Sequence, residues 1–302
     1  MRPWPAILAA VGGSFMVGFM PLVTLRLYAD GIGAASMLVW RYGIALVPLF
    51  LAAMLTGHDL RAAVRAGAWR IALVGATLGV GQTLCFWESL HWLDTSVAIL
   101  LFYTYPALTL ALDRVIFGRP VRPLAVGCVA LILAGAGLVL LPGVTGGGID
   151  SRGLLWLLPS PVFYAFYLAA NAALMRRHPP LVGAGFLYLG LALAFLLAGA
   201  VQGVAVPGTL AAWLLILFIA LGPGALTVTL FSYSVPRLGP ASYAIIANTE
   251  LVTVVAIGVL LLGEAMTAER SLGGALIVTG ILTHALARHP ASAPLAARRA
   301  AS

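Results

Sequence analysis

Ten long apolar stretches run along the chain, and short polar segments separate them. A helix needs about 20 apolar residues to cross the hydrocarbon core of a bilayer. Each stretch comes close to that length, so the pattern predicts an all-α protein with ten membrane-spanning helices. They cover residues 5–25, 33–55, 70–90, 95–117, 123–142, 153–174, 181–203, 210–233, 239–262 and 271–287.

The second half of this pattern repeats the first at an offset of 145 residues. The stripe of Gly79, Gln82, Phe86 and Ser89 returns as Gly224, Thr227, Phe231 and Ser234. From Gly79 to Gly135, eleven of 57 positions are identical to their counterparts, where chance in so Ala-, Leu- and Gly-rich a chain would give roughly five. The repetition suggests an internal duplication, which is the architecture of secondary transporters.

Composition supports a bilayer environment and excludes several mechanisms. Hydrophobic residues make up 62% of the chain and charged residues only 9%, whereas soluble domains carry about a quarter charged residues. All seventeen basic residues are arginines. Without lysine there is no Walker A nucleotide site and no Schiff-base lysine for retinal or pyridoxal phosphate. We therefore expect no cofactor, and a membrane protein without a nucleotide site draws work from gradients or does no work at all. The two cysteines, Cys85 and Cys128, lie inside apolar stretches and indicate no metal site.

The arginines are distributed unequally between the two sides of the predicted membrane. Thirteen lie on one side and three on the other, and Arg41 lies within a span. Because basic loops stay in the cytoplasm, both termini are expected there. This orientation also accounts for the net charge of +8 without nucleic-acid binding. Five helices per half then make the two repeats inverted.

This organisation gives the chain four parts. The first five-helix repeat covers residues 1–142 and the second covers 153–287. Between them, residues 143–152 form a connector with three glycines at 146–148. Residues 288–302 are rich in Ala, Pro and Arg, and we expect a disordered cytoplasmic tail.

Several local motifs occur in an order that resembles a known family. Arg41 interrupts the second span, Phe86 to Leu90 end the third, and Tyr105-Pro106 lie in the fourth. The second half contains the related segments 241–244, 250–251, 262–264 and 273–280. The chain resembles the EamA-type branch of the drug/metabolite transporter superfamily. The resemblance implies ten helices in two inverted five-helix repeats, and export of amino acids or other small metabolites. Two positions, Arg119 and Leu251, depart from the acidic residue and the proline of the family pattern.

Polar and aromatic residues recur at helical spacing within six of the spans. Polar groups that face lipid are costly, so these faces should point toward a shared centre. Hydroxyl, amide and aromatic groups suit a small zwitterionic or amphipathic solute, and the alternative is interhelical packing. The candidate substrate-binding residues are Gln82, Phe86, Phe102, Tyr105, Tyr164, Tyr167, Asn171, Thr227, Phe231, Tyr243 and Glu250.

Two charged residues lie within the predicted spans. Glu250 is near the middle of its span, where a carboxylate costs roughly 2.5–3.5 kcal/mol. It is either a partner for a substrate ammonium group, a proton carrier, or a protonated structural residue. Arg41 lies nearer the external end of its helix. Because a long side chain reaches the interface easily, we expect it to snorkel or form a salt bridge rather than hold a substrate carboxylate.

Prolines within the spans predict hinges, because proline frees backbone carbonyls and permits bending. The candidate gating residues are Pro106, Pro159, Pro161 and Pro223. Rocking of the two repeats about such hinges would give alternating access.

These observations favour a multi-pass secondary transporter of the cytoplasmic (inner) membrane that exports small metabolites, with amino acids as the leading class. Its partners would be a small-molecule substrate and the bilayer, with proton coupling left open and either a monomer or a homodimer. A drug, nucleoside or sugar permease of the same fold is one alternative. An intramembrane enzyme is another, but the chain has no His-Glu-x-x-His or Gly-x-Ser-x-Gly motif. We expect no catalytic residues.

Overall fold

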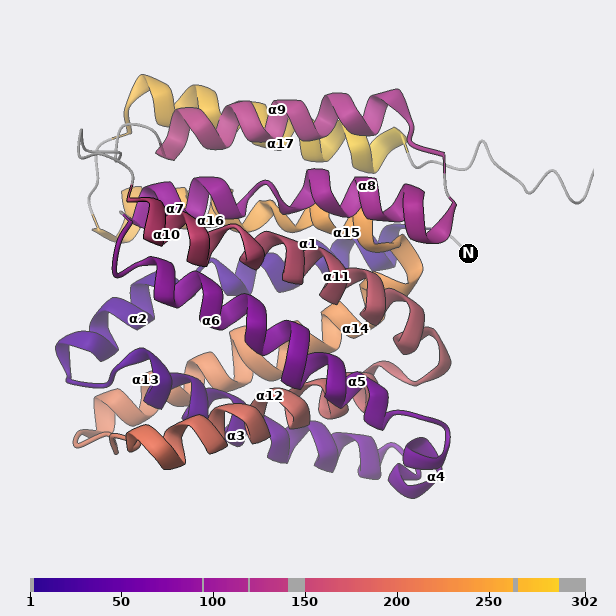
Figure 1. Ribbon diagram of the computed structural model, residues 1–302, viewed down its shortest axis with the longest axis vertical. Helices are drawn as coiled ribbons and strands as arrows, with labels where there is room; N and C mark the ends of the chain where they lie inside the picture. Colours follow the sequence, from indigo (N-terminus) through magenta and orange to yellow (C-terminus); the bar gives the residue numbers. More distant parts are fainter. Residues whose placement is uncertain (1–2, 94, 119, 141–149, 263–265, 288–302) are drawn as a thin grey trace, which may run out of the picture.

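The computed structural model (Figure 1) describes residues 3–93, 95–118, 120–140, 150–262 and 266–287. Throughout these residues the regular secondary structure is helical, with no strand. The expected connector and tail, residues 143–149 and 288–302, lie outside the described part. So do Arg119, Gly263 and Glu264.

Helices occupy each of the ten ranges expected from the apolar pattern. In the first half they are α1 (Trp4–Val17), α2 (Met20–Ala29), α3 (Ala34–Leu55), α4 (Leu60–Arg65), α5 (Trp69–Val74), α6 (Val80–Ser89), α7 (Thr95–Phe102), α8 (Tyr105–Phe117) and α9 (Pro123–Leu140). In the second they are α10 (Ser151–Leu157), α11 (Pro159–Leu174), α12 (Pro180–Gln202), α13 (Leu210–Ala220), α14 (Thr227–Leu238), α15 (Pro240–Ala247), α16 (Thr249–Leu262) and α17 (Ala268–Ala287).

Among the described residues, nine continuous or jointed helices are long and apolar enough to cross a membrane. The remaining expected range, 123–142, contains α9, whose apolar part, Pro123–Val139, is shorter. Several spans extend a few residues further than expected; the range 210–233, for example, continues to Leu238. The chain is therefore a multi-pass membrane protein.

The helix pairings repeat between the two halves. Helix α1 of the first half packs on α14, α15 and α16 of the second half, and α11 of the second half packs on α6 and α8 of the first. Likewise α3 contacts α13, whereas α12 contacts α5. Two pairs join equivalent helices: α3 packs on α12, and α9 on α17. Figure 1 shows α9 and α17 side by side at one edge of the molecule. Each half therefore packs against the other through equivalent helices.

Much of the surface of this bundle is apolar, and a few small polar groups are buried within its hydrophobic interior. Val201 and Leu260 are 88% and 80% exposed, as expected of side chains that face lipid. Most of the buried hydroxyl and amide groups bond to nearby backbone carbonyls. These bonds satisfy polar groups that have no partner in hydrocarbon.

Two spans break at positions that the repeat relates. The span of α7 and α8 breaks at Tyr103 and Thr104, and that of α15 and α16 breaks at Asn248. The same hydrogen bond forms at both breaks: Thr104 Oγ1 donates to Leu101 O at 2.7 Å, and Thr249 Oγ1 to Ile246 O at 2.8 Å. Both breaks are inside protein, where such bonds replace the lost helix bonds.

A second pair of irregular segments lies in the spans of α5–α6 and α13–α14. Gly75–Gly79 and Leu221–Leu226 both have π-helical hydrogen bonding. π-helical turns inside α-helices are frequent at functional sites. Gly75 also allows close approach to α12, because a Cβ there would lie 2.5 Å from the carbonyl oxygen of Leu187.

Glycines hold α9 and α17 together at very short range. A Cβ on Gly135 would lie 2.5 Å from the carbonyl oxygen of Gly273, and one on Gly273 would lie 2.6 Å from that of Gly135. Small residues at such crossings let two backbones approach and gain van der Waals contact without a hydrophobic driving force. The helices of the fifth and tenth predicted spans therefore pack on each other through glycine.

Gly135→Ala should therefore destabilise the protein, because its methyl group meets backbone that cannot move aside. Overpacking typically costs about 1–3 kcal/mol, which should lower the midpoint of thermal unfolding in detergent by several degrees. Gly127→Ala on the same helix is the control, since a Cβ there meets nothing within 4 Å. Equal midpoints for the two variants would contradict the close α9–α17 contact.

Candidate substrate site

Seven of the predicted residues are aromatic, and the structure joins their rings into one continuous chain. It crosses the interior from α6 and α7 through α8 and α11 to α14 and α15. Successive contacts run from Phe86 to Phe102 (5.6 Å between ring centroids), Phe102 to Tyr105 (5.3 Å), Tyr105 to Tyr164 (4.8 Å), Tyr164 to Tyr167 (5.7 Å), Tyr167 to Phe231 (5.7 Å) and Phe231 to Tyr243 (5.2 Å).

The geometry of these contacts is that of favourable ring pairs. Tyr105 meets Tyr164 edge to face at 86°, and Tyr164 and Tyr167 are stacked at 15°. Such pairs stabilise by about 0.5–1.5 kcal/mol beyond the area they bury. Phe86 and Phe231 are repeat-related and lie toward the two ends of the chain of rings. Both halves of the protein therefore build one aromatic wall.

Glu250 lies beside this wall, at the helix break. The break at Asn248 places it in the first turn of α16, rather than in the middle of a continuous helix as the sequence pattern suggests. Its carboxyl group acts electrostatically on the hydroxyls of Tyr103, Tyr105, Tyr164 and Tyr243. Within the described residues its side chain makes no hydrogen bond and no ion pair, and it is only partly exposed. A carboxylate in this position can accept a bond from a solute.

Tyr105, the repeat counterpart of Glu250, stabilises the same break from the other half. Its hydroxyl donates to the carbonyl oxygen of Ala244 at 3.4 Å, and Asn248 Nδ2 donates to that oxygen at 2.8 Å. Together these bonds satisfy a carbonyl that the interrupted helix leaves free. The residue that positions the break is therefore also a member of the aromatic wall.

The three remaining predicted residues bond to nearby backbone or neighbouring side chains. Thr227 Oγ1 lies 3.2 Å from both the Gly13 and the Gly222 carbonyl oxygens, which ties α14 to α1. Asn171 Nδ2 donates to Tyr167 O at 2.9 Å. Gln82 Oε1 accepts a bond from its neighbour Thr83 at 3.4 Å. Thr227 therefore contributes to interhelical packing, the alternative that its spacing left open.

Arg41 is the charged residue whose position the sequence pattern did not foresee. It lies among interior groups instead of reaching the interface, and in the described part of the chain it forms no salt bridge. Its Nη2 donates to the carbonyl oxygen of Pro223 at 3.0 Å, and its guanidinium lies 5.3 Å from the ring centroid of Tyr42. The sequence did contain one indication of this interior position. Arg41 lies in an apolar span and has no acidic residue one helical turn away to pair with.

All four predicted hinge prolines lie at irregular points of the helices. Pro106 is in the first turn of α8, and Pro159 and Pro161 begin α11 just after the junction with α10. Pro223 lies within the π-helical segment before α14. Proline lacks the N–H that an intact helix would use, so it favours such points.

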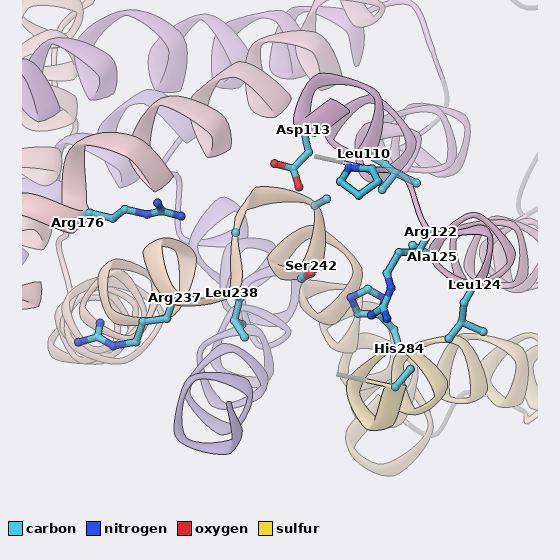
Figure 2. Close-up of a pocket in the computed structure, with 14 residues that line it drawn as sticks. Leu110, Asp113, Arg122, Leu124, Ala125, Arg176, Arg237, Leu238, Ser242 and His284 are labelled. Atoms are coloured by element: carbon cyan, nitrogen blue, oxygen red, sulfur yellow. The ribbon is translucent and has the colours of Figure 1, made fainter. Parts of the chain in front are cut away.

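A cavity of about 360 Å³ opens at one end of the bundle, among the ends of α8, α9, α14, α15 and α17 (Figure 2). Its walls include Asp113, Arg122, Arg176, Arg237 and His284. None of the eleven predicted substrate residues lines it. Ser242 in its wall is the sequence neighbour of Tyr243 on α15. The position of the cavity at basic helix ends suits a vestibule rather than the binding centre.

Comparison with known proteins agrees with this architecture. Curated protein sequences give no significant match. One crystal structure of a protein matches the fold with a TM-score of 0.81 at 20% sequence identity, over 93% of this chain and 98% of the other. The sequence matches the EamA-like transporter family over residues 4–141 and again over 151–285. Because these two matches, one in each half, cover most of the chain, the protein belongs to the EamA-like transporter family.

Proposed function

We propose that this EamA-like membrane transporter exports small metabolites, amino acids first among them, across the cytoplasmic membrane by alternating access. The observation that carries the proposal is the continuous aromatic wall contributed by both halves, with the carboxyl group of Glu250 beside its tyrosines. A wall of rings and hydroxyls suits the side chain of an amphipathic solute. A path for bare ions would need rings of charge or of carbonyl groups instead.

The irregular helices support a rocking movement. The two Thr-bonded breaks and the two π-helical segments lie at repeat-related points, so each half would carry an equivalent hinge. The vestibule with Arg122, Arg176 and Arg237 would lie on the cytoplasmic side and attract carboxylate-bearing solutes for export. If the test below shows no transport of amino acids, two alternatives remain. The protein then transports a drug, a nucleoside or a sugar, or it is an intramembrane enzyme.

The proposed topology has ten spans with both termini in the cytoplasm. It keeps the inverted five-helix repeats at residues 1–142 and 153–287, joined through 143–152 and followed by the tail at 288–302. Within that arrangement the transporter works as a monomer or a homodimer, and proton coupling is tested separately through Glu250.

The substrate class is tested by counterflow in liposomes. We expect vesicles preloaded with unlabelled phenylalanine or threonine to accumulate the labelled amino acid transiently and saturably. Protein-free vesicles, and vesicles preloaded with a sugar, are the controls. If a folded sample shows no counterflow of either amino acid, the amino-acid proposal fails and nucleosides, sugars and drugs become the candidates.

Glu250→Gln tests whether Glu250 carries protons. The substitution keeps the shape of the side chain and removes its titration, so we expect transport driven by a pH gradient to be lost while exchange without a gradient partly remains. Glu269→Gln, on the exposed first turn of α17, is the matched control. If Glu250→Gln leaves gradient-driven transport unchanged, Glu250 has no part in coupling.

Topology is tested on a single helix. In a background with Cys85→Ala and Cys128→Ala, Ala287→Cys at the vestibule end of α17 should react with an impermeant maleimide only from the cytoplasmic side. Ser271→Cys, at the opposite end of α17, should react only from outside; both positions are exposed. Labelling in the reverse pattern would place the termini outside.

A further inference from the structure

Arg41 occupies an interior position with neutral partners. Besides its bond to the carbonyl oxygen of Pro223, its guanidinium lies 5.3 Å from the ring centroid of Tyr42. Tyr42 in turn meets Tyr188 edge to face at 5.0 Å and stacks on Phe195 at 5.5 Å and 13°. The bond to the π-helical segment and the ring of Tyr42 orient the planar guanidinium.

The guanidinium keeps unused donors. Its Nε is inaccessible to solvent, and in the described part of the chain it has no hydrogen-bond partner. A guanidinium has five N–H donors, and in the described part of the chain the carbonyl oxygen of Pro223 accepts from one of its nitrogens. A buried positive charge without a counterion is costly, and an interior that maintains one is suited to an anionic ligand.

Arg41 and Glu250 interact with the same aromatic wall. Arg41 acts electrostatically on Tyr167, a member of the wall, and on Glu250 itself. Yet the two residues make no ion pair with each other among the described contacts, and each remains without a counterion in contact. A guanidinium group and a carboxyl group therefore border the same group of rings.

We propose that Arg41 binds the carboxylate of the transported solute while Glu250 faces its ammonium group, so that the site selects amino acids as zwitterions. This inference rests on the proposed function and adds the polarity of substrate binding. The guanidinium fork matches a carboxylate through two parallel hydrogen bonds, which a lysine could not provide. The aromatic wall then receives the side chain, and the solute supplies the counterion that each of the two groups lacks.

The competing role for Arg41 is purely structural. Its bond to Pro223 O fastens α3 to the π-helical segment, so losing it could weaken transport of every substrate by the same factor. A ligand role instead changes the ratio between solutes with and without a carboxylate. The test must therefore compare the affinity for solutes that carry a carboxylate with the affinity for solutes that lack one.

The experiment compares phenylalanine with phenylethylamine, which lacks the carboxylate, and with phenylpropionate, which lacks the amine. Binding to the purified protein is measured from the ligand-dependent shift of thermal unfolding, alongside counterflow of phenylalanine. For Arg41→Gln we expect the affinity for phenylalanine and phenylpropionate to fall at least about tenfold, as for the loss of a hydrogen bond to a charged group, while phenylethylamine binding is unchanged.

Two further variants keep the result interpretable. Arg41→Lys retains the charge, folds if Arg41→Gln does not, and should weaken phenylalanine and phenylpropionate binding relative to phenylethylamine. Arg26→Gln, an exposed arginine on α2, should leave all three affinities unchanged.

The outcomes separate the two proposals. If the wild-type protein transports phenylalanine but Arg41→Gln and Arg41→Lys weaken all three ligands equally, the carboxylate role of Arg41 is wrong and the proposed function stands. If the folded wild-type protein neither binds nor exchanges any amino acid, the proposed function and this inference fall together.

Discussion

The structure depends on one constraint, which is that hydrocarbon offers no hydrogen-bond partner to a polar group. Hydroxyls in the bundle therefore return to the backbone of their own helix, as Thr109 does to Tyr105 and Ser234 to Leu230. Helix breaks are tolerated only where protein surrounds them. The break at Asn248 survives because its own amide and the hydroxyl of Tyr105 satisfy the carbonyl of Ala244.

Under the same constraint the helices of the bundle make two kinds of contact, one through backbone and one through large side chains. At the edge, Gly135 and Gly273 let α9 and α17 pack backbone to backbone, which leaves no space between them. In the centre, large rings separate α6, α8, α11 and α14, and two charged residues border those rings. The contact at the edge is therefore made by backbone, and the contact in the centre is made by side chains.

Arg41 connects these features, because it bonds the π-helical segment and lies against Tyr42, whose ring packs on Tyr188 of α12. The repeat does not supply a second such residue, since Phe186 occupies the position 145 residues after Arg41. The two similar halves therefore differ in the charge that they place among these rings.

The local pattern of the chain was enough to locate the helical ranges, the repeat and the polar faces, because each of these follows from the period of a helix and the thickness of a bilayer. The aromatic members of those faces, including Phe86, Tyr164 and Phe231, meet in one chain. Spacing along one helix cannot say which neighbour a side chain meets, so Thr227 on the same face bonds to the backbone of α1 instead.

The sequence by itself determined that this protein lies in a bilayer and that it has two related halves. These properties depend on the transfer of side chains between water and hydrocarbon, which composition and periodicity report directly. Only the tertiary structure decided that Glu250 begins a helix and that Arg41 lies inside, bonded to Pro223. The position of Arg41 depends on Pro223, which is 182 residues away in the chain. The helix break before Glu250 depends on a hydrogen bond from Tyr105 in the other half. A local sequence pattern contains neither partner.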